Sequence, residues 1–212
     1  MVLQRFVILF AMVSAVYAIP APEIEKRIDA LLARMTLEEK LGQMSQSTSM
    51  QAPLSEEIKQ QIRRGRWGSF LNAGLPPDRA EAQRIAVKES RLGIPLLFGR
   101  DVIHGYRTVF PIPLGQAATW NPQLIERAAA IAGKEASTEG IHWAFAPMLD
   151  VTRDPRWGRI AESLGEDPFL VGELGAAMIR GFQGKSVDHR EPSDRMRQQR
   201  SRHPNVMIRA PG

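Results

Sequence analysis

The sequence predicts an α/β fold in which helices cover a mostly parallel sheet. Helix and strand signals alternate between residues 24 and 184. The expected strands are short, nearly continuous apolar runs, which is typical of parallel strands buried on both faces. The expected helices begin at capping residues and carry apolar side chains at helical spacing. Such alternation is typical of a parallel sheet with helices on its faces.

Three strands are expected within this alternation. The first is Trp-Gly-Ser-Phe-Leu at 67–71, and the second is Ile-Pro-Leu-Leu-Phe at 94–98, which lies between Gly93 and Gly99. The third is His-Trp-Ala-Phe-Ala at 142–146. Glycines beside an apolar run indicate where a strand stops.

Five helices are expected, and three of them have clear start signals. Thr36 begins a Thr-Leu-Glu-Glu capping box, while Asn121 and Asp167 are capping residues that are each followed by proline. Gly140 is expected to end the helix that Asn121 begins. A long, proline-containing loop is expected before Asn121. The five helices are expected at residues 24–35, 36–44, 78–91, 122–140 and 167–181.

The number of strands limits the possible architecture. A closed (β/α)8 barrel has eight strands and typically about 250 residues. The body of this chain, residues 19–184, has 166 residues and three expected strands. We therefore expect less than a complete barrel, and a smaller doubly wound sheet remains possible on length alone.

The positive charge of the chain is concentrated in residues 185–212. This segment holds seven Lys/Arg and three Asp/Glu, whereas residues 19–184 hold 20 basic and 20 acidic residues. A neutral body does not favour nucleic-acid binding. The segment has no aromatic residue and no periodic apolar face, so we expect a disordered basic tail. A nucleic-acid-binding arm is the alternative, which the lack of aromatic side chains for base stacking disfavours.

The first 18 residues have the pattern of a secretory signal peptide. Arg5 supplies a positive charge, residues 6–16 form an apolar run too short to span a bilayer as a helix, and Ala18 is a small residue at a cleavage position. We expect cleavage after Ala18, a secreted or periplasmic protein, and no membrane association after cleavage. The alternative is an uncleaved anchor or a buried first helix.

The sequence gives no indication of a metal ion or another cofactor. It contains no cysteine, which excludes disulfides and thiolate metal sites. Its four histidines, at positions 104, 142, 189 and 203, do not occur in a metal-ligand spacing. We therefore expect neither a metal nor a cofactor.

Two acidic residues follow expected strands at the end where ligands bind in parallel α/β folds. Asp101 follows the second expected strand and Asp150 follows the third. A carboxylate at this edge can accept hydrogen bonds from neighbouring hydroxyl groups, as sugar binding requires. The alternative is an ion pair that orders a loop. It is favoured for Asp150, because Arg153 and Arg156 are close in sequence, and neither interpretation is favoured for Asp101.

The segment after Asp150 is rich in arginine. Residues 153–159 contain three arginines and one tryptophan, and Glu162 follows them. Guanidinium groups can hold hydroxyl groups or a carboxylate in a fixed plane. The alternative is a loop ordered by salt bridges. His104 and His142 are expected to be structural, with His142 in the core.

Six motifs follow one another along the body of the chain. They are Asp-Val-Ile-His-Gly (101–105), Thr-Val-Phe-Pro (108–111), Thr-Trp-Asn-Pro (119–122), Ala-Pro-Met-Leu-Asp (146–150), Arg-Asp-Pro-Arg-Trp-Gly-Arg (153–159) and Glu-Ser-Leu-Gly-Glu-Asp-Pro (162–168). In this order they resemble glycoside hydrolase family 3, and most of all its periplasmic β-glucosidase group. The resemblance covers about residues 23–186. It implies an incomplete (β/α)8 TIM-type barrel, with about the first three strands present.

The resemblance also implies a function and two substrate-binding residues. The family's aspartate in this position, here Asp101, binds hydroxyl groups of the sugar in the −1 subsite. The arginine of the Trp-Gly-Arg motif, here Arg159, lines the same subsite and resembles β-glucosidases and β-xylosidases. The implied reaction is retaining hydrolysis of terminal β-D-glucosyl residues from a β-glucoside or a short oligosaccharide.

Several motifs of the family do not occur in this chain. The family carries a Lys-His pair on the next strand, an aspartate nucleophile in a Ser-Asp-Trp motif on a later strand, and an acid/base carboxyl group farther downstream. Ser193-Asp194-Arg195 is no substitute, since no apolar strand precedes it. We therefore expect no catalytic residue here and an inactive fragment; a non-catalytic secreted sugar-binding protein is the alternative. The abrupt change in composition after Ser186 predicts a truncated or frame-shifted gene model, and nothing in the sequence specifies an oligomeric state.

Overall fold

The computed structural model describes residues 22–48, 50, 52–184 and 206–207 of the 212-residue chain. The predicted signal peptide lies outside the described residues, as does the predicted tail apart from two residues. The chain divides into two units, which are described separately: Met1–Met35 and Thr36–Gly212. The first unit contains the helix α2 (Pro22–Arg34), which confirms the helix expected at 24–35.

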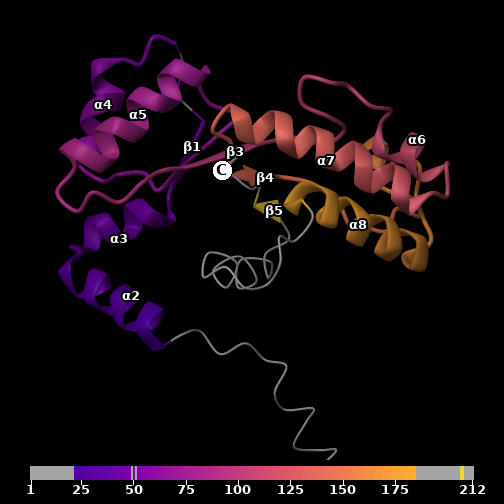
Figure 1. The fold of residues 1–212 in the computed structure, drawn as a ribbon, viewed down its shortest axis with the longest axis horizontal. Helices are drawn as coiled ribbons and strands as arrows, with labels where there is room; N and C mark the ends of the chain where they lie inside the picture. Colours follow the sequence, from indigo (N-terminus) through magenta and orange to yellow (C-terminus); the bar gives the residue numbers. More distant parts are fainter. Residues whose placement is uncertain (1–21, 49, 51, 185–205, 208–212) are drawn as a thin grey trace, which may run out of the picture. The chain divides into compact units, whose positions relative to one another are not determined.

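The second unit is built on a sheet whose first four strands are parallel and lie in chain order (Figure 1). The parallel strands are β1 (Gln46–Ser47), β2 (Ser69–Leu71), β3 (Leu97–Arg100) and β4 (Trp143–Ala144). A further strand, β5 (Val206–Met207), pairs with β4 in the antiparallel direction. The α/β class with a parallel sheet is therefore confirmed.

Two strands differ from the expectation of three. β1 was not expected, because Gln46 and Ser47 are polar and give neither an apolar run nor an alternating pattern. β5 lies within the segment for which the sequence predicts a disordered tail. Its two residues are too few to give a periodic signal, since strand prediction needs an alternation over about four residues or more.

The helices of the second unit confirm the predicted capping residues. Thr36 accepts a hydrogen bond from the Glu39 N–H while its own N–H donates to the Glu39 carboxylate, so the capping box is present. Asn121 and Asp167 also accept backbone N–H groups in the first turns of their helices. The helices that match these and the remaining expectation are α3 (Leu37–Met44), α5 (Pro76–Glu89), α7 (Pro122–Thr138) and α8 (Pro168–Gln183).

Two helices and a short 3₁₀ turn were not expected. α4 (Glu56–Arg63) carries only two apolar side chains, Ile58 and Ile62, among its eight residues, which is a weak periodic signal. α6 (Pro113–Ala117) lies inside the predicted proline-containing loop. The 3₁₀ turn η2 (Ile160–Glu162) follows the arginine-rich segment.

The core of the second unit runs across the sheet through stacked aromatic side chains. Phe70 of β2 and Phe98 of β3 are fully buried, with ring centroids 6.2 Å apart. Phe98 stacks in turn on the ring of His142, at 5.9 Å. The His142 Nδ1 accepts the Phe98 backbone N–H at 3.3 Å, so the predicted structural role of His142 is confirmed, although the residue is half-buried and directly precedes β4.

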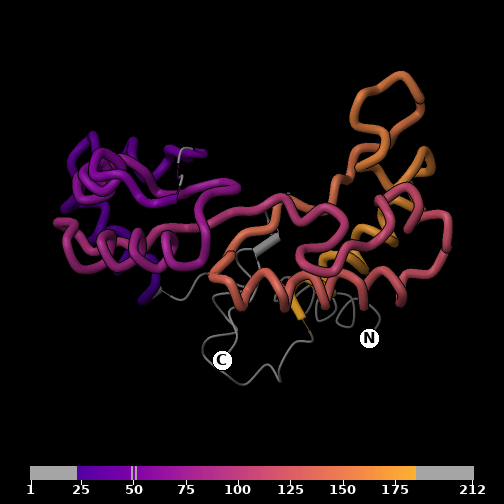
Figure 2. Tube along the Cα trace, turned by 90° about the horizontal axis from the view of Figure 1, so that it is seen from above, coloured from indigo at the N-terminus to yellow at the C-terminus, as the bar shows by residue number. Residues whose placement is uncertain are grey.

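Two pairs of helices lie side by side, α4 with α5 and α7 with α8 (Figure 1). α4 is joined to α5 by the ion pairs Lys59–Glu81, at 3.3 Å, and Arg63–Glu89, at 2.7 Å. α7 and α8 pack closely, because a Cβ atom at Gly181 would lie only 2.3 Å from the carbonyl oxygen of Glu126. The chain between β4 and α8 forms a loop that extends away from α7 (Figure 2).

Candidate functional site

The candidate site lies where the parallel strands end. Asn72 directly follows β2 and Asp101 directly follows β3. Asp150 comes a few residues after β4. Carboxyl ends of neighbouring parallel strands meet at one edge of the sheet, which is where ligands bind in folds of this class.

Asp101 is held by the side-chain amide of Asn72. The Asp101 backbone N–H donates to Asn72 Oδ1 at 2.9 Å, and Asn72 Nδ2 donates to Asp101 Oδ2 at 2.5 Å. Both side chains are exposed. Asn72 was not singled out from the sequence; its only local signal is its place directly after the apolar residues of a strand.

His104 forms hydrogen bonds across the loop that follows Asp101. The His104 Nδ1 lies 2.9 Å from the carbonyl oxygen of Phe110, and the Phe110 N–H donates to the His104 carbonyl at 2.8 Å. Gly105 has a φ of +124°, and a Cβ atom there would lie 2.0 Å from the Thr108 carbonyl oxygen. His104 therefore contributes to loop structure, as predicted.

Two glutamates near the end of α7 form hydrogen bonds with the loop that follows Asp101. Glu135 accepts the Arg107 and Thr108 N–H groups at 2.8 and 2.9 Å and the Thr108 hydroxyl at 2.6 Å. Glu139 accepts the Tyr106 hydroxyl and the Arg107 guanidinium. The Thr108 hydroxyl lowers the pKa of Glu135, and the Tyr106 hydroxyl, followed by Arg107, lowers that of Glu139.

Arg159 lies beyond β4, at the start of η2. Its Nε and Nη2 atoms donate to the two carboxylate oxygens of Glu162 at 3.1 and 2.8 Å. This hydrogen bonding raises the pKa of Arg159, and the negative charges of Asp150 and Asp101 add to the effect. The alternative of a salt-bridged loop therefore holds for Glu162, which pairs with Arg159.

Asp150 does not form the ion pair that its neighbours in sequence suggest. Arg156 turns to Asp154 instead, with Nη2 and Oδ2 2.7 Å apart. Within the described residues, no hydrogen bond or ion pair involves the carboxylate of Asp150. The expected ion pair with Arg153 or Arg156 was therefore wrong; Arg156 pairs with Asp154, two residues away in sequence.

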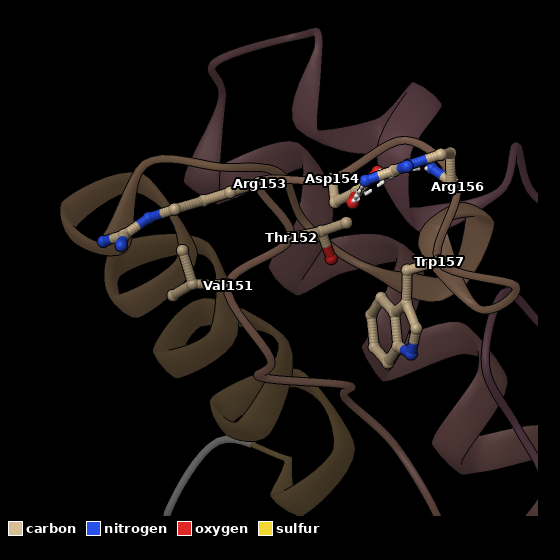
Figure 3. Close-up of a pocket in the computed structure, with 6 residues that line it drawn as sticks. All are labelled: Val151, Thr152, Arg153, Asp154, Arg156 and Trp157. Atoms are coloured by element: carbon tan, nitrogen blue, oxygen red, sulfur yellow. Dashed lines mark hydrogen bonds and ion pairs between the residues drawn. The ribbon is translucent and has the colours of Figure 1, made fainter.

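A hollow of about 870 Å³ lies along the arginine-rich loop. The hydroxyl of Thr152 is buried and has no hydrogen-bond partner in the described part of the chain. It points to the side of the loop on which the Trp157 indole lies, while Arg156 reaches back to Asp154 (Figure 3). The lining residues are Val151, Thr152, Arg153, Asp154, Arg156 and Trp157.

Neither a metal-binding cluster nor a membrane-spanning helix occurs among the described residues. No group of three or more His, Cys, Asp or Glu side chains among them is arranged to hold a metal ion. None of the helices they form is both long and apolar enough to cross a membrane.

The chain is similar to several β-glucosidases. The periplasmic β-glucosidase of Salmonella typhimurium is 40% identical over 165 residues, which are 78% of this chain and 21% of that protein. The crystal structure of a Listeria innocua β-glucosidase with glucose has a TM-score of 0.67 and 40% identity, over 76% of this chain and 24% of that one. A mutant of the Listeria enzyme in complex with laminaribiose has the same TM-score at 41% identity and covers the same shares.

These relatives define the extent of the match. The chain spans between a fifth and a quarter of their length. The model of the glycosyl hydrolase family 3 N-terminal domain matches residues 36–190, which include every parallel strand and both candidate sugar-binding residues. The chain therefore belongs to glycosyl hydrolase family 3 and carries part of its N-terminal, TIM-barrel-like domain.

Proposed function

We propose that residues 36–184 supply sugar-binding groups of the −1 subsite in a β-glucosidase-type glycoside hydrolase. The observation that carries this proposal is the position of Asp101 directly after β3, where parallel strands end, in a chain whose match to the family's N-terminal domain includes Arg159. The glucose and laminaribiose bound by the Listeria enzymes support a terminal β-D-glucosyl residue as the ligand.

The two side chains offer complementary hydrogen bonds to a sugar. The Asp101 carboxylate accepts hydrogen bonds from hydroxyl groups, and the Arg159 guanidinium donates to hydroxyl oxygens. Glu162 engages the Nε and Nη2 atoms of Arg159, and no hydrogen bond within the described residues uses its Nη1. Nη1 is therefore the atom that we assign to the sugar.

The test is glucose binding by the purified chain, measured by titration calorimetry. We expect Asp101→Ala to weaken binding at least tenfold, since removing an ionised hydrogen-bond partner costs about 1.5–3 kcal/mol. Asp29→Ala is the matched control, because Asp29 is an exposed aspartate of helix α2 that does not line the candidate site. Equal affinities for the Asp101 and Asp29 variants would contradict the assignment.

The second candidate function is sugar binding without hydrolysis. It is supported by the roles that the family resemblance assigns to Asp101 and Arg159, which are those of substrate-binding residues and not those of a nucleophile or an acid/base group. Retaining hydrolysis needs two carboxyl groups about 5 Å apart across the scissile bond. We propose that the 212-residue chain by itself binds the sugar and does not cleave it.

We also propose that residues 1–18 direct export and are removed. Support comes from the pattern of Arg5, the apolar run and Ala18, and from the name of the periplasmic Salmonella relative. The intact mass of exported protein tests this proposal: it should correspond to a chain that begins at Ile19, and a chain that retains Met1 would refute it.

A further inference from the structure

Asn72 and Asp101 are each the first residue after one of two neighbouring parallel strands. The register pairs Leu71 with Gly99, so Asp101 lies one residue farther along its strand than Asn72. One side-chain amide then contacts Asp101 twice, with Oδ1 on the backbone N–H and Nδ2 on the carboxylate. The backbone and the side chain of Asp101 are thus fixed by the same group.

Asn72 is itself fixed by its backbone. Its N–H donates to the Gly99 carbonyl at 2.9 Å, which continues the pairing of β2 with β3 by one residue. Its φ is +51°, in the left-handed region that few residues other than glycine and asparagine adopt readily. The turn that this conformation produces directs the amide toward Asp101 and not along the strand.

The contact leaves Asp101 with one engaged and one available carboxylate oxygen. Asn72 Nδ2 donates a hydrogen bond to Asp101 Oδ2, and no hydrogen bond among the described residues uses Asp101 Oδ1. The last torsion of an aspartate side chain has a broad energy profile, so an exposed carboxylate without such a partner samples many orientations. A bond to one oxygen restricts that rotation and directs the other oxygen.

We propose that Asn72 is a positioning residue that orients the Asp101 carboxylate for the hydroxyl groups of the sugar; the inference rests on the function proposed above. Because the pair is exposed, it adds little to folding stability. Its effect is expected in sugar affinity and not in the melting temperature. Because the amide of Asn72 is neutral, it holds Asp101 without adding a charge beside the carboxylate. A lysine or arginine at this position would add a positive charge there.

Two variants of the full chain separate the amide from the backbone conformation. Asn72→Gly removes the amide and retains the left-handed conformation. Asn72→Asp tolerates the same conformation but replaces the Nδ2 donor with an oxygen that repels the Asp101 carboxylate. Asn121→Gly is the control, since it removes an exposed asparagine that accepts the Leu124 N–H far along the sequence.

The measurements are the Asp101 amide resonance in ¹H–¹⁵N spectra, the dissociation constant for D-glucose, and the melting temperature. In Asn72→Gly we expect the Asp101 amide proton to move upfield, the dissociation constant to rise about tenfold, and the melting temperature to stay within about 2 °C. Asn72→Asp should weaken glucose binding at least as much, and Asn121→Gly should change neither the resonance nor the affinity.

The possible failures are distinguishable. An unchanged Asp101 amide in Asn72→Gly overturns the inference, because the hydrogen bond would then be absent. A shifted amide with unchanged glucose affinity overturns it as well, because the contact would have no consequence for the sugar. If the parent chain binds no glucose while the amide shifts, the contact of Asn72 with Asp101 is present, but the proposed function fails and the role of this contact in sugar binding fails with it.

Discussion

At the scale of single residues, Glu139 joins segments that lie far apart in sequence. Its carboxylate accepts hydrogen bonds from the Tyr106 hydroxyl and the Arg107 guanidinium, both in the loop after Asp101. Its carbonyl oxygen accepts a hydrogen bond from Arg79 Nε at 3.0 Å. Arg79 is buried and also donates to the Gly74 carbonyl at 2.6 Å. This network could not be predicted from the sequence. Glu139 has no local feature that distinguishes it from other residues at the end of a helix, and its partners are 32 to 60 positions away.

Glu139→Gln is expected to destabilise the protein in a pH-dependent way. The pKa of Glu139 is held below its ordinary value by the Tyr106 hydroxyl and then by Arg107. A carboxyl group with a lowered pKa stabilises the folded state above its unfolded pKa, about 4.3 for glutamate, and this contribution is lost as the pH falls through the folded pKa. At pH 7 the variant should lose about 1–3 kcal/mol of unfolding free energy, and the deficit should shrink below pH 4.

Urea denaturation at pH 7 and at pH 3.5 checks this expectation. Glu126→Gln is the control, because the Glu126–Arg180 ion pair joins two exposed side chains and such pairs contribute about 0–1 kcal/mol. A deficit in Glu139→Gln that grows on acidification would show that the carboxylate is not the stabilising form.

At the scale of secondary-structure elements, the sequence predicted what is encoded within a few residues. The capping box of Thr36 and the caps Asn121 and Asp167 involve partners three residues away, so the helix starts were confirmed. β1 and α4 were missed because their residues are mostly polar and their positions depend on neighbours in the sheet and on Ile62, which is buried by tertiary contacts. The contact of α7 with α8 could likewise not be predicted, since it depends on Gly181, which faces the other helix.

Gly181→Ala is expected to separate α7 from α8. The added Cβ atom would lie 2.3 Å from the Glu126 carbonyl oxygen and 2.7 Å from the Ala129 Cβ, so one helix must shift. Overpacking of this kind costs about 1–3 kcal/mol. Gly172→Ala in the same helix is the control: its Cβ atom meets nothing within 4 Å, and alanine is a better helix former by about 0.8–1 kcal/mol.

Thermal unfolding followed by circular dichroism measures both effects. The Gly181 variant should melt below the parent and the Gly172 variant above it. If both variants melt higher, helix propensity alone decides the outcome, and the close approach of α7 and α8 is refuted.

At the scale of the whole molecule, the order of motifs was more informative than their chemistry. The motifs between 101 and 168 predicted the family, and the match of residues 36–190 to its N-terminal domain confirmed it. The alternation of helix and strand signals predicted the α/β architecture with a parallel sheet. The motifs did not predict Asn72, because its effect on Asp101 arises only when β2 and β3 are paired side by side.

The 212-residue chain is expected not to hydrolyse aryl β-glucosides. A general acid for this reaction needs a raised pKa, so that it is protonated near neutral pH. The acidic residues around the site show the opposite: Arg159 lowers the pKa of Glu162, and Arg156 lowers that of Asp154. Asp101, held by Asn72, is assigned to sugar binding, so a nucleophile and acid pair is missing from these residues.

The measurement is nitrophenol release from nitrophenyl β-glucoside by the purified chain. It should equal that of a mock preparation, with a full-length family 3 β-glucosidase as the positive control. Turnover that Asp101→Ala abolishes and Asp154→Ala retains would instead make Asp101 a catalytic group and would refute its assignment to binding alone.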